Sequence, residues 1–317
     1  MIKPKEKNAD SKLFSTTSGI EMIAVKKDDM FVYLVFENKI LIDIEMENAK
    51  ELPIHTKCVG KVSSVSKDIN SAYIVLPDKS KAFLKNADPE LKCEQNIAVE
   101  ITRASSKGKL QSVKMIDENI EHRTDLSVIS YGERAYASCF RRYKFDRIIT
   151  DNEEIFSLLT EYCKNNNVLE LSDIYMYNDS MVSLSVLYSV SKKIKEAVSK
   201  IVWLKSGANI VIEETAAFIV IDVNSAKKDR SKNNSFLNIN LEACEEIFRQ
   251  MNLRNLSGII LIDFINISED EEKILCDKIS ELCKKQKSYT KLVDITKLGI
   301  VEITRKKEGI TLNDLNI

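Results

Sequence analysis

Two stretches in the second half of the chain share one pattern, in which a run of apolar residues ends abruptly in an aspartate. The first run, Ala217 to Ile221, ends at Asp222, and the second, Gly258 to Ile262, ends at Asp263. Apolar runs rich in β-branched residues predict buried strands. Their spacing of roughly 40 residues fits one strand-helix-strand unit. Both aspartates are therefore expected at the same edge of an α/β sheet, where ligands and metals usually bind.

The segments around these runs predict the rest of an α/β domain. From Asn240 onward, apolar residues recur at spacings of three and four, which predicts a helix packed on the sheet. Ser268-x-x-Glu271 is the pattern of a capping box and predicts a second helix after Asp263. Further strands are expected at residues 210–213, 293–296 and 300–305.

The first half predicts a mixture of strands and helices. Residues 1–18 are polar and are expected to form a disordered lead. Strands are expected at 21–25, 30–38, 39–45 and 147–150, and helices at 135–144, 152–165 and 181–202.

Residues 57–114 contain five short β segments and no convincing helix, which predicts an OB-fold barrel. Such barrels bind single-stranded nucleic acid by stacking bases on exposed aromatic rings beside basic residues. Tyr73 and Phe83, on neighbouring strands, and Lys61 and Lys107 have this character. The alternative is that both rings belong to the barrel core.

Composition excludes several classes of protein. The formal net charge of -1 excludes a uniformly basic coat for nucleic acid. Seven cysteines without a Cys-x-x-Cys pair argue against a zinc site or a disulfide framework, and two histidines in unrelated surroundings argue against a Ser-His or Cys-His nucleophile. No apolar run is long enough to span a membrane, so we expect a cytoplasmic, reduced protein.

Two segments concentrate positive charge near the predicted acidic edge. Residues 227–232 carry four positive side chains, among them Lys227 and Arg230. Residues 284–307 carry eight positive and two negative side chains, among them Lys297 and Arg305. Both segments could bind phosphate groups of a nucleic acid, although a solvated surface has the same composition.

Asp222 and Asp263 indicate a functional site only when they are considered as a pair. A single aspartate at a strand end is more often a turn or cap residue. Two neighbouring carboxylates repel each other unless a cation lies between them, and Mg²⁺ needs only one or two protein carboxylates when phosphate completes its shell. Asp222 and Asp263 are therefore the candidate metal ligands, and metal-assisted hydrolysis of a phosphodiester in single-stranded nucleic acid is the chemistry they suggest.

Six motifs in the second half match one known family in order and spacing. They are Trp203-Leu204-x-Ser206-Gly207, Ile221-Asp222-Val223-Asn224-Ser225-Ala226-Lys227, Asn240-Leu241-Glu242-Ala243, Glu246-Ile247-x-Arg249-Gln250, Leu253-Arg254-x-Leu256-x-Gly258-x-Ile260-x-Ile262-Asp263-Phe264-Ile265 and Ile295-x-Lys297-x-Gly299-x-x-Glu302-x-x-Arg305. The set resembles the catalytic core of the ribonuclease E/G family.

The resemblance implies a fold and a division into domains. It implies a ribonuclease-H-like subdomain formed by residues 19–56 and 115–200, which is interrupted by the OB-fold insert at 57–114. A deoxyribonuclease-like catalytic α/β subdomain is implied for residues 201–317.

The resemblance also implies a function. It implies that Asp222 and Asp263 bind magnesium and that Asn224 supports the catalytic group. Tyr73, Phe83 and Lys107 fall where the family contacts RNA. The implied reaction is cleavage of single-stranded, AU-rich RNA to give a 5′-phosphate and a 3′-hydroxyl.

The chain also departs from the family pattern. The segment between the barrel and Ala135 is short, so we expect no competent 5′-monophosphate sensor even though Arg123-Thr124 resembles its Arg-Thr pair. We expect no zinc-bridged assembly, and either a monomer or a homodimer. Ala216 and Asn266 stand where acidic residues are common, which leaves open a catalytically weakened RNA-binding protein of the same fold.

Overall fold

The computed structural model describes residues 19–105, 108–120, 125–225, 235–307 and 311–314. The chain divides into two compact units, one running to Ser189 and the other from Val190 to Asn313. Each unit is considered by itself below. Among the described residues, no helix combines the length and apolarity that crossing a membrane requires.

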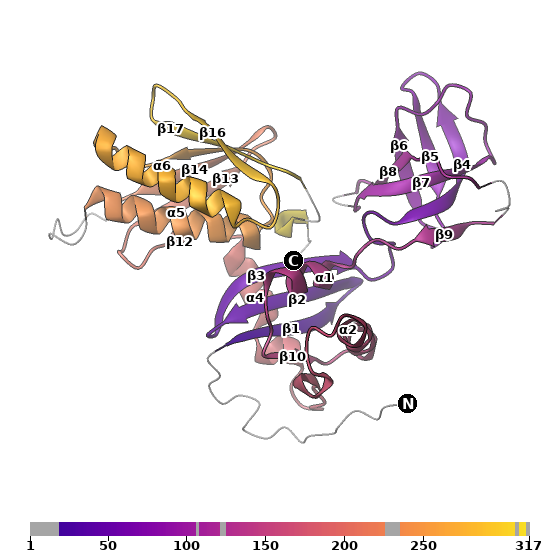
Figure 1. Cartoon of the computed structure of the whole chain (residues 1–317), viewed down its shortest axis with the longest axis horizontal. Coiled ribbons are helices and arrows are strands. Elements are labelled where there is room, and N and C mark those ends of the chain that lie inside the picture. The colour runs from indigo at the N-terminus through magenta and orange to yellow at the C-terminus, as the bar shows by residue number, and fades with distance from the viewer. Residues whose placement is uncertain (1–18, 106–107, 121–124, 226–234, 308–310, 315–317) are drawn as a thin grey trace. The chain divides into compact units, whose positions relative to one another are not determined.

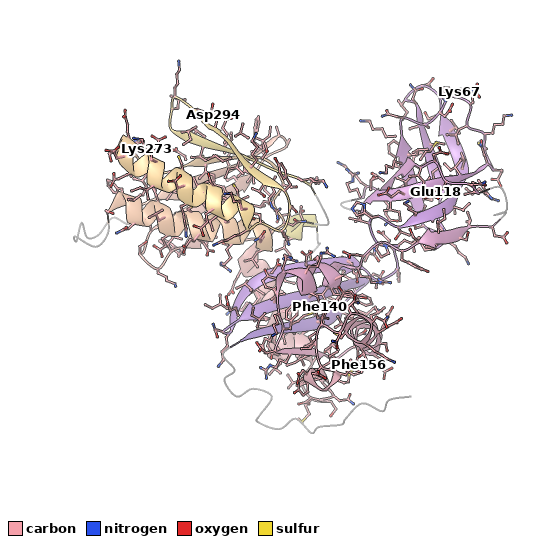
Figure 2. The ribbon with its side chains drawn as sticks, in the orientation of Figure 1. Lys67, Glu118, Phe140, Phe156, Lys273 and Asp294 are labelled. Atoms are coloured by element: carbon pink, nitrogen blue, oxygen red, sulfur yellow. The ribbon has the colours of Figure 1, made fainter. Side chains whose placement is uncertain are left out.

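The first unit contains a five-stranded sheet in the order β11-β10-β1-β2-β3. Helices α1 and α2 pack on one face of it, where the core includes Phe31 and Tyr33 of the sheet and Ile155 and Leu159 of α2. Phe140 on α1 and Phe156 on α2 belong to this helical layer (Figure 2). The elements are β1 (Ile20–Lys27), β2 (Met30–Glu37), β3 (Ile40–Asn48), β10 (Arg147–Thr150), β11 (Ile174–Met176), α1 (Ala135–Arg142) and α2 (Glu153–Asn166).

A closed five-stranded barrel is the second element of this unit. Strands β5, β6, β8, β7 and β4 are hydrogen-bonded in that order, and a further pairing of β5 with β4 closes the barrel. The prediction of five strands in this region is therefore confirmed, and the short strand β9, which pairs with β4, was not predicted. The bounds are β4 (Lys57–Ser66), β5 (Ser71–Val75), β6 (Lys81–Lys85), β7 (Asn96–Arg103), β8 (Gln111–Met115) and β9 (Ser127–Ser130).

The helix predicted over residues 181–202 is wrong as a single element. The segment forms a short helix α3 (Leu184–Leu187), then α4 (Val190–Ala197), then the strand β12 (Ile201–Trp203). The break falls at Ser189, which has a left-handed φ of 50°. A helix cannot continue through that conformation, and no glycine or proline marked it in the sequence.

The second unit is a six-stranded sheet in the order β12-β13-β14-β15-β17-β16. Helices α5 and α6 lie next to each other over one of its faces (Figure 1). Strands β14 and β15 are parallel and are joined through α5, as the strand-helix-strand prediction requires. The remaining bounds are β13 (Asn209–Glu214), β14 (Phe218–Asn224), β15 (Gly258–Asp263), β16 (Thr290–Ile295), β17 (Ile300–Arg305), α5 (Phe236–Leu253) and α6 (Glu269–Lys284).

Alternation along β14 separates a buried face from an open face. Ile219, Ile221 and Val223 pack into the core beneath the helices, together with Phe248 of α5 and Ile279 of α6. Successive residues of a strand point to opposite faces. Phe218, Val220, Asp222 and Asn224 therefore lie on the face that the two helices leave open.

Candidate active site

Asp222 and Asp263 are direct neighbours across the parallel pair β14 and β15. The apolar residues before them fix this register, because a slip of one residue would turn Ile221 and Ile262 out of the core. Asp222 is half-buried and Asp263 is exposed. The structure thus brings together the two carboxylates that the sequence proposed as a pair.

Asn224 completes a cluster of three polar side chains at this edge. It lies two residues beyond Asp222 on the same strand, so its side chain emerges on the same face. Its amide Nδ2 donates a 2.7 Å hydrogen bond to Oδ2 of Asp222. This bond holds the carboxylate of Asp222 through one of its two oxygens.

Asn240, on the second turn of α5, fixes the segment that follows Asp263. The side chain is fully buried. Its Nδ2 donates to the carbonyl oxygen of Ile265 at 2.7 Å, and its Oδ1 accepts from the Ile265 N–H at 3.1 Å. The sequence pattern placed Asn240 only at a helix start. Because α5 already begins at Phe236, after the Ser235 cap, Asn240 instead serves as a buried anchor.

The predicted capping box follows immediately. Ser268 and Glu271 form the reciprocal bonds of the box at the start of α6. The carboxylate of Glu271 accepts from the Ser268 N–H at 3.0 Å, and these bonds lower the pKa of Glu271. Asn240 and the capping box together fix both ends of the loop from Phe264 to Ile267.

Lys297 lies at the tip of the hairpin between β16 and β17. The tip is a tight turn in which Gly299 adopts a φ of 83° and its N–H donates to the carbonyl of Thr296. Ile300, the first residue of β17, pairs with Asp263, so the hairpin tip borders the acidic edge. Lys297 is exposed there. Lys227 and Arg230 lie outside the described residues.

Arg305 does not fit its predicted role as an RNA contact. It is only 2% exposed, and its guanidinium donates to the side chains of Asn252 and Asn255 and to the carbonyl of Leu256. It closes the end of β17 against the loop between α5 and β15. Counting positive charges could not distinguish this buried cation from an exposed one.

Arg254 is a second buried arginine that sequence reasoning did not single out for a role. Its Nε donates to Gln250 at 2.8 Å and its terminal nitrogen donates to the Ser199 carbonyl at 2.7 Å. Burial lowers the pKa of Arg254 to about 10. The side chain links α5 to the segment that precedes β12.

The barrel carries its two predicted aromatic residues on one patch of its outer surface. Tyr73 on β5 and Phe83 on β6 are paired across the strands, and their ring centroids lie 5.7 Å apart in an edge-to-face arrangement. Tyr73 is exposed and Phe83 half-buried, so the alternative that both rings are core residues is wrong.

Two lysines lie beside Phe83 on the same strand. Lys81 and Lys85 flank Phe83 on β6 and are exposed; sequence reasoning missed both, although strand alternation places them on the outer face. Lys61 forms an exposed ion pair with Glu94 at 3.3 Å. Lys107 and the Arg123-Thr124 pair lie outside the described residues.

Ala216 lies at the other end of β14 from the carboxylates. It belongs to the bend before the strand, and the four residues from Phe218 to Asp222 alone span about 13 Å. This position argues against residue 216 as a direct metal ligand beside Asp222. Asn266 is exposed in the loop that follows Asp263, at the same edge of the sheet as the two carboxylates.

The fold and this edge define a class of protein. Two carboxylates at the ends of adjacent parallel strands, in a chain that also holds a barrel with an exposed tyrosine ring, are typical of α/β proteins that act on phosphate esters of nucleic acids. Comparison with known proteins gives the family directly. Residues 92–308 match the ribonuclease E/G family, and the chain belongs to it.

Individual relatives agree with this assignment. Ribonuclease E of Synechocystis sp. is 34% identical over 175 residues, which cover 54% of this chain and 26% of the relative. Ribonuclease G of Salmonella typhimurium is 29% identical over 239 residues, or 73% of this chain and 47% of the relative. Ribonuclease G of Haemophilus influenzae is 32% identical over 206 residues, covering 61% and 40%. The chain thus spans less than half the length of these relatives.

Proposed function

We propose that the chain is a magnesium-dependent endoribonuclease that cleaves single-stranded, AU-rich RNA in cytoplasmic RNA processing or decay. The observation that carries the proposal is the register of Asp222 against Asp263, with Asn224 bonded to the first of them. Membership of the ribonuclease E/G family supports the same reaction class.

The donor set fits magnesium. Carboxylate oxygens are the hard ligands that Mg²⁺ prefers, and this ion retains several waters when only one or two protein carboxylates bind it. Among the described residues, no group of three or more His, Cys, Asp or Glu side chains forms a denser metal site. Asp222 and Asp263 would hold the ion, which supplies a water activated for attack on the phosphodiester.

The remaining residues position the site. Asn224 keeps one oxygen of Asp222 occupied and its carboxylate plane fixed. Asn240 fixes the backbone just after Asp263, so that this carboxylate keeps its place beside Asp222. The products would carry a 5′-phosphate and a 3′-hydroxyl.

The barrel would bind the RNA strand. Tyr73 and Phe83 offer two adjacent ring surfaces on which bases stack. Lys81 and Lys85 would attract the phosphates that connect these bases. Stacking is tolerant of sequence because every base has a π face, which suits a substrate without secondary structure. We further propose that the first sheet is ribonuclease-H-like and the second deoxyribonuclease-like.

The alternative, a catalytically weakened RNA-binding protein, rests mainly on Asn266. Asn266 stands at the acidic edge, and an amide there contributes no negative charge to a cation site. Ala216, the other residue that suggested weakening, lies at the opposite end of β14 from the carboxylates.

Cleavage of a 5′-labelled AU-rich RNA, with magnesium or with EDTA, separates these functions. Asp222→Asn and Asp263→Asn should abolish cleavage and retain RNA binding. Asp294→Asn is the matched control, since Asp294 is an exposed aspartate on β16 of the same sheet (Figure 2). Equal cleavage by all four proteins would sink the site assignment, and binding without cleavage by the unaltered chain would favour the binding protein.

A further inference from the structure

The open face of the second sheet, which carries the carboxylate pair at one edge, exposes large apolar side chains. Water-exposed apolar side chains gathered on one face mark an interaction surface. The exposed apolar residues on this face are Ile201, Trp203, Phe218, Val220 and Ile259. Trp203 is the most exposed of them, at 70%, and it is the only tryptophan in the chain.

Trp203 lies on the same face as the candidate active site. Its neighbour Val202 packs into the core, so the indole points to the opposite, open face. Along one row of the sheet, Trp203 pairs with Asn209, and Asn209 pairs with Asn224. Two strand spacings, about 10 Å, therefore separate the backbone of Trp203 from that of Asn224.

The edge that carries Trp203 is fixed by the core and by α5. Leu204, the next residue, is buried, and its N–H donates to the carbonyl of Ala208 at 2.9 Å across the turn. The carboxylate of Glu242 accepts from the backbone N–H of Lys205 at 2.7 Å and from that of Ser206 at 3.3 Å. The indole is thus presented to solvent from a defined backbone position, which limits the entropy lost when a ligand stacks on it.

The polar residues of the same face indicate which kind of ligand would cover the indole of Trp203. A protein partner flat enough to cover the sheet would also remove two adjacent carboxylates from water, which is strongly unfavourable. A single-stranded nucleic acid whose phosphodiester lies at Asp222 and Asp263 keeps those groups polar and brings a neighbouring base to the row of Asn224 and Trp203. Aromatic rings bind such bases by stacking.

We propose that Trp203 is a substrate-positioning residue that stacks a base of the RNA next to the bond being cleaved. This rests on the proposed function in that RNA is the ligand. It adds a base contact on the catalytic sheet itself, separate from the rings of the barrel. The stacked base fixes the register of the strand over the carboxylates, so its loss lowers cleavage more than overall RNA binding.

Tryptophan fluorescence reports on this residue alone, because the chain has no other tryptophan. The 317-residue chain in EDTA is titrated with a single-stranded AU-rich RNA, and binding is followed in parallel by polarisation of a labelled copy. Emission from Trp203 should fall in step with binding. Binding by polarisation with unchanged emission overturns the proposal and leaves the proposed function standing, whereas absence of binding overturns both.

Variants test the effect on cleavage. Trp203→Ala should lower kcat/KM by roughly 5- to 150-fold, the equivalent of one stacked base, and Trp203→Phe should recover most of it. Tyr289→Ala is the matched control, because Tyr289 is also 70% exposed but precedes β16 at the opposite end of the sheet from Asp263. Equal losses in Trp203→Ala and Tyr289→Ala overturn the assignment, as does a Trp203 emission that changes with protein concentration alone, which indicates a second copy on this face.

Discussion

Asp222 and Asp263 face each other across two parallel strands, although 40 residues separate them in the chain. The strands deliver them to one edge because each follows an apolar run whose inward residues are locked into the same core. Neither carboxylate can move to the other face without exposing that core. The pair is therefore a product of strand register, and its chemistry depends on the few residues that orient each carboxylate.

Asn224 gives the first prediction. Asn224→Ala removes the 2.7 Å bond to Asp222 and should lower the cleavage rate by roughly 10- to 100-fold while raising the magnesium concentration required, as loss of an orienting partner does at metal sites. Asn224→Asp should be worse, since it replaces the donor with a third negative charge. Asn209→Ala, on the adjacent strand, should keep the magnesium dependence of the unaltered chain. A normal magnesium titration for Asn224→Ala would contradict the role given to this amide.

The barrel rings give a second prediction. Tyr73→Ala and Phe83→Ala should each weaken RNA binding by about 1–3 kcal/mol in a polarisation assay, because each removes one stacking surface. The double variant should lose less than the sum, since the two rings contact each other. Tyr73→Phe should bind normally. Tyr131→Ala, which alters another exposed tyrosine, is the control, and an equal loss there would show that the effect is not local to the barrel patch.

Much of this site followed from elementary patterns. Two apolar runs ending in aspartate, one helix apart, were enough to predict that Asp222 and Asp263 are neighbours, because parallel strands joined by a helix must end at the same edge. The five strands of the barrel were predictable because residues 57–114 contain five short β segments and no convincing helix. Tyr73 and Phe83 were identified as aromatic residues on neighbouring strands of the predicted barrel, but only the structure showed that Tyr73 is exposed and that the two rings contact each other.

The errors have a common physical origin in tertiary context. The segment from Met181 to Val202 kept helical spacing, yet Ser189 adopts a left-handed conformation, and residues from Ile201 onward pair as the edge strand β12. That mistake concealed which face Trp203 occupies. Arg305 was assigned to an RNA contact because of its charge, and Ala216 was assigned to the metal site because acidic residues are common at its position in the family pattern. Only the structure shows that Arg305 is buried and that Ala216 lies at the opposite end of β14 from Asp222.

Arg305 gives a third prediction, on stability. Arg305→Met removes donors to a buried carbonyl and two asparagine side chains, and each buried acceptor left unsatisfied costs about 1–3 kcal/mol of unfolding free energy. Urea unfolding should therefore shift to lower concentration, with RNA affinity of the folded protein unchanged. Lys307→Met, two residues on and exposed, should unfold as the unaltered chain does. Weaker RNA binding by Arg305→Met at normal stability would instead show that Arg305 contacts RNA.

Cys244 gives the last prediction, on alkaline pH. It is fully buried on α5, and burial raises the pKa of its thiol from the ordinary 9.0 to about 12. Between these values the unfolded chain has lost the proton and the folded chain retains it, so the unfolding free energy falls as pH rises from about 9 towards 12. At pH 10 this thiol should account for about 1.4 kcal/mol of lost stability.

Urea unfolding at pH 8 and pH 10 measures this loss. Cys244→Ala should lose less stability between the two pH values than the unaltered chain does. Cys93→Ala, which alters an exposed thiol, should lose as much as the unaltered chain. An identical pH dependence in Cys244→Ala and the unaltered chain would mean that this thiol ionises alike in the folded and unfolded states.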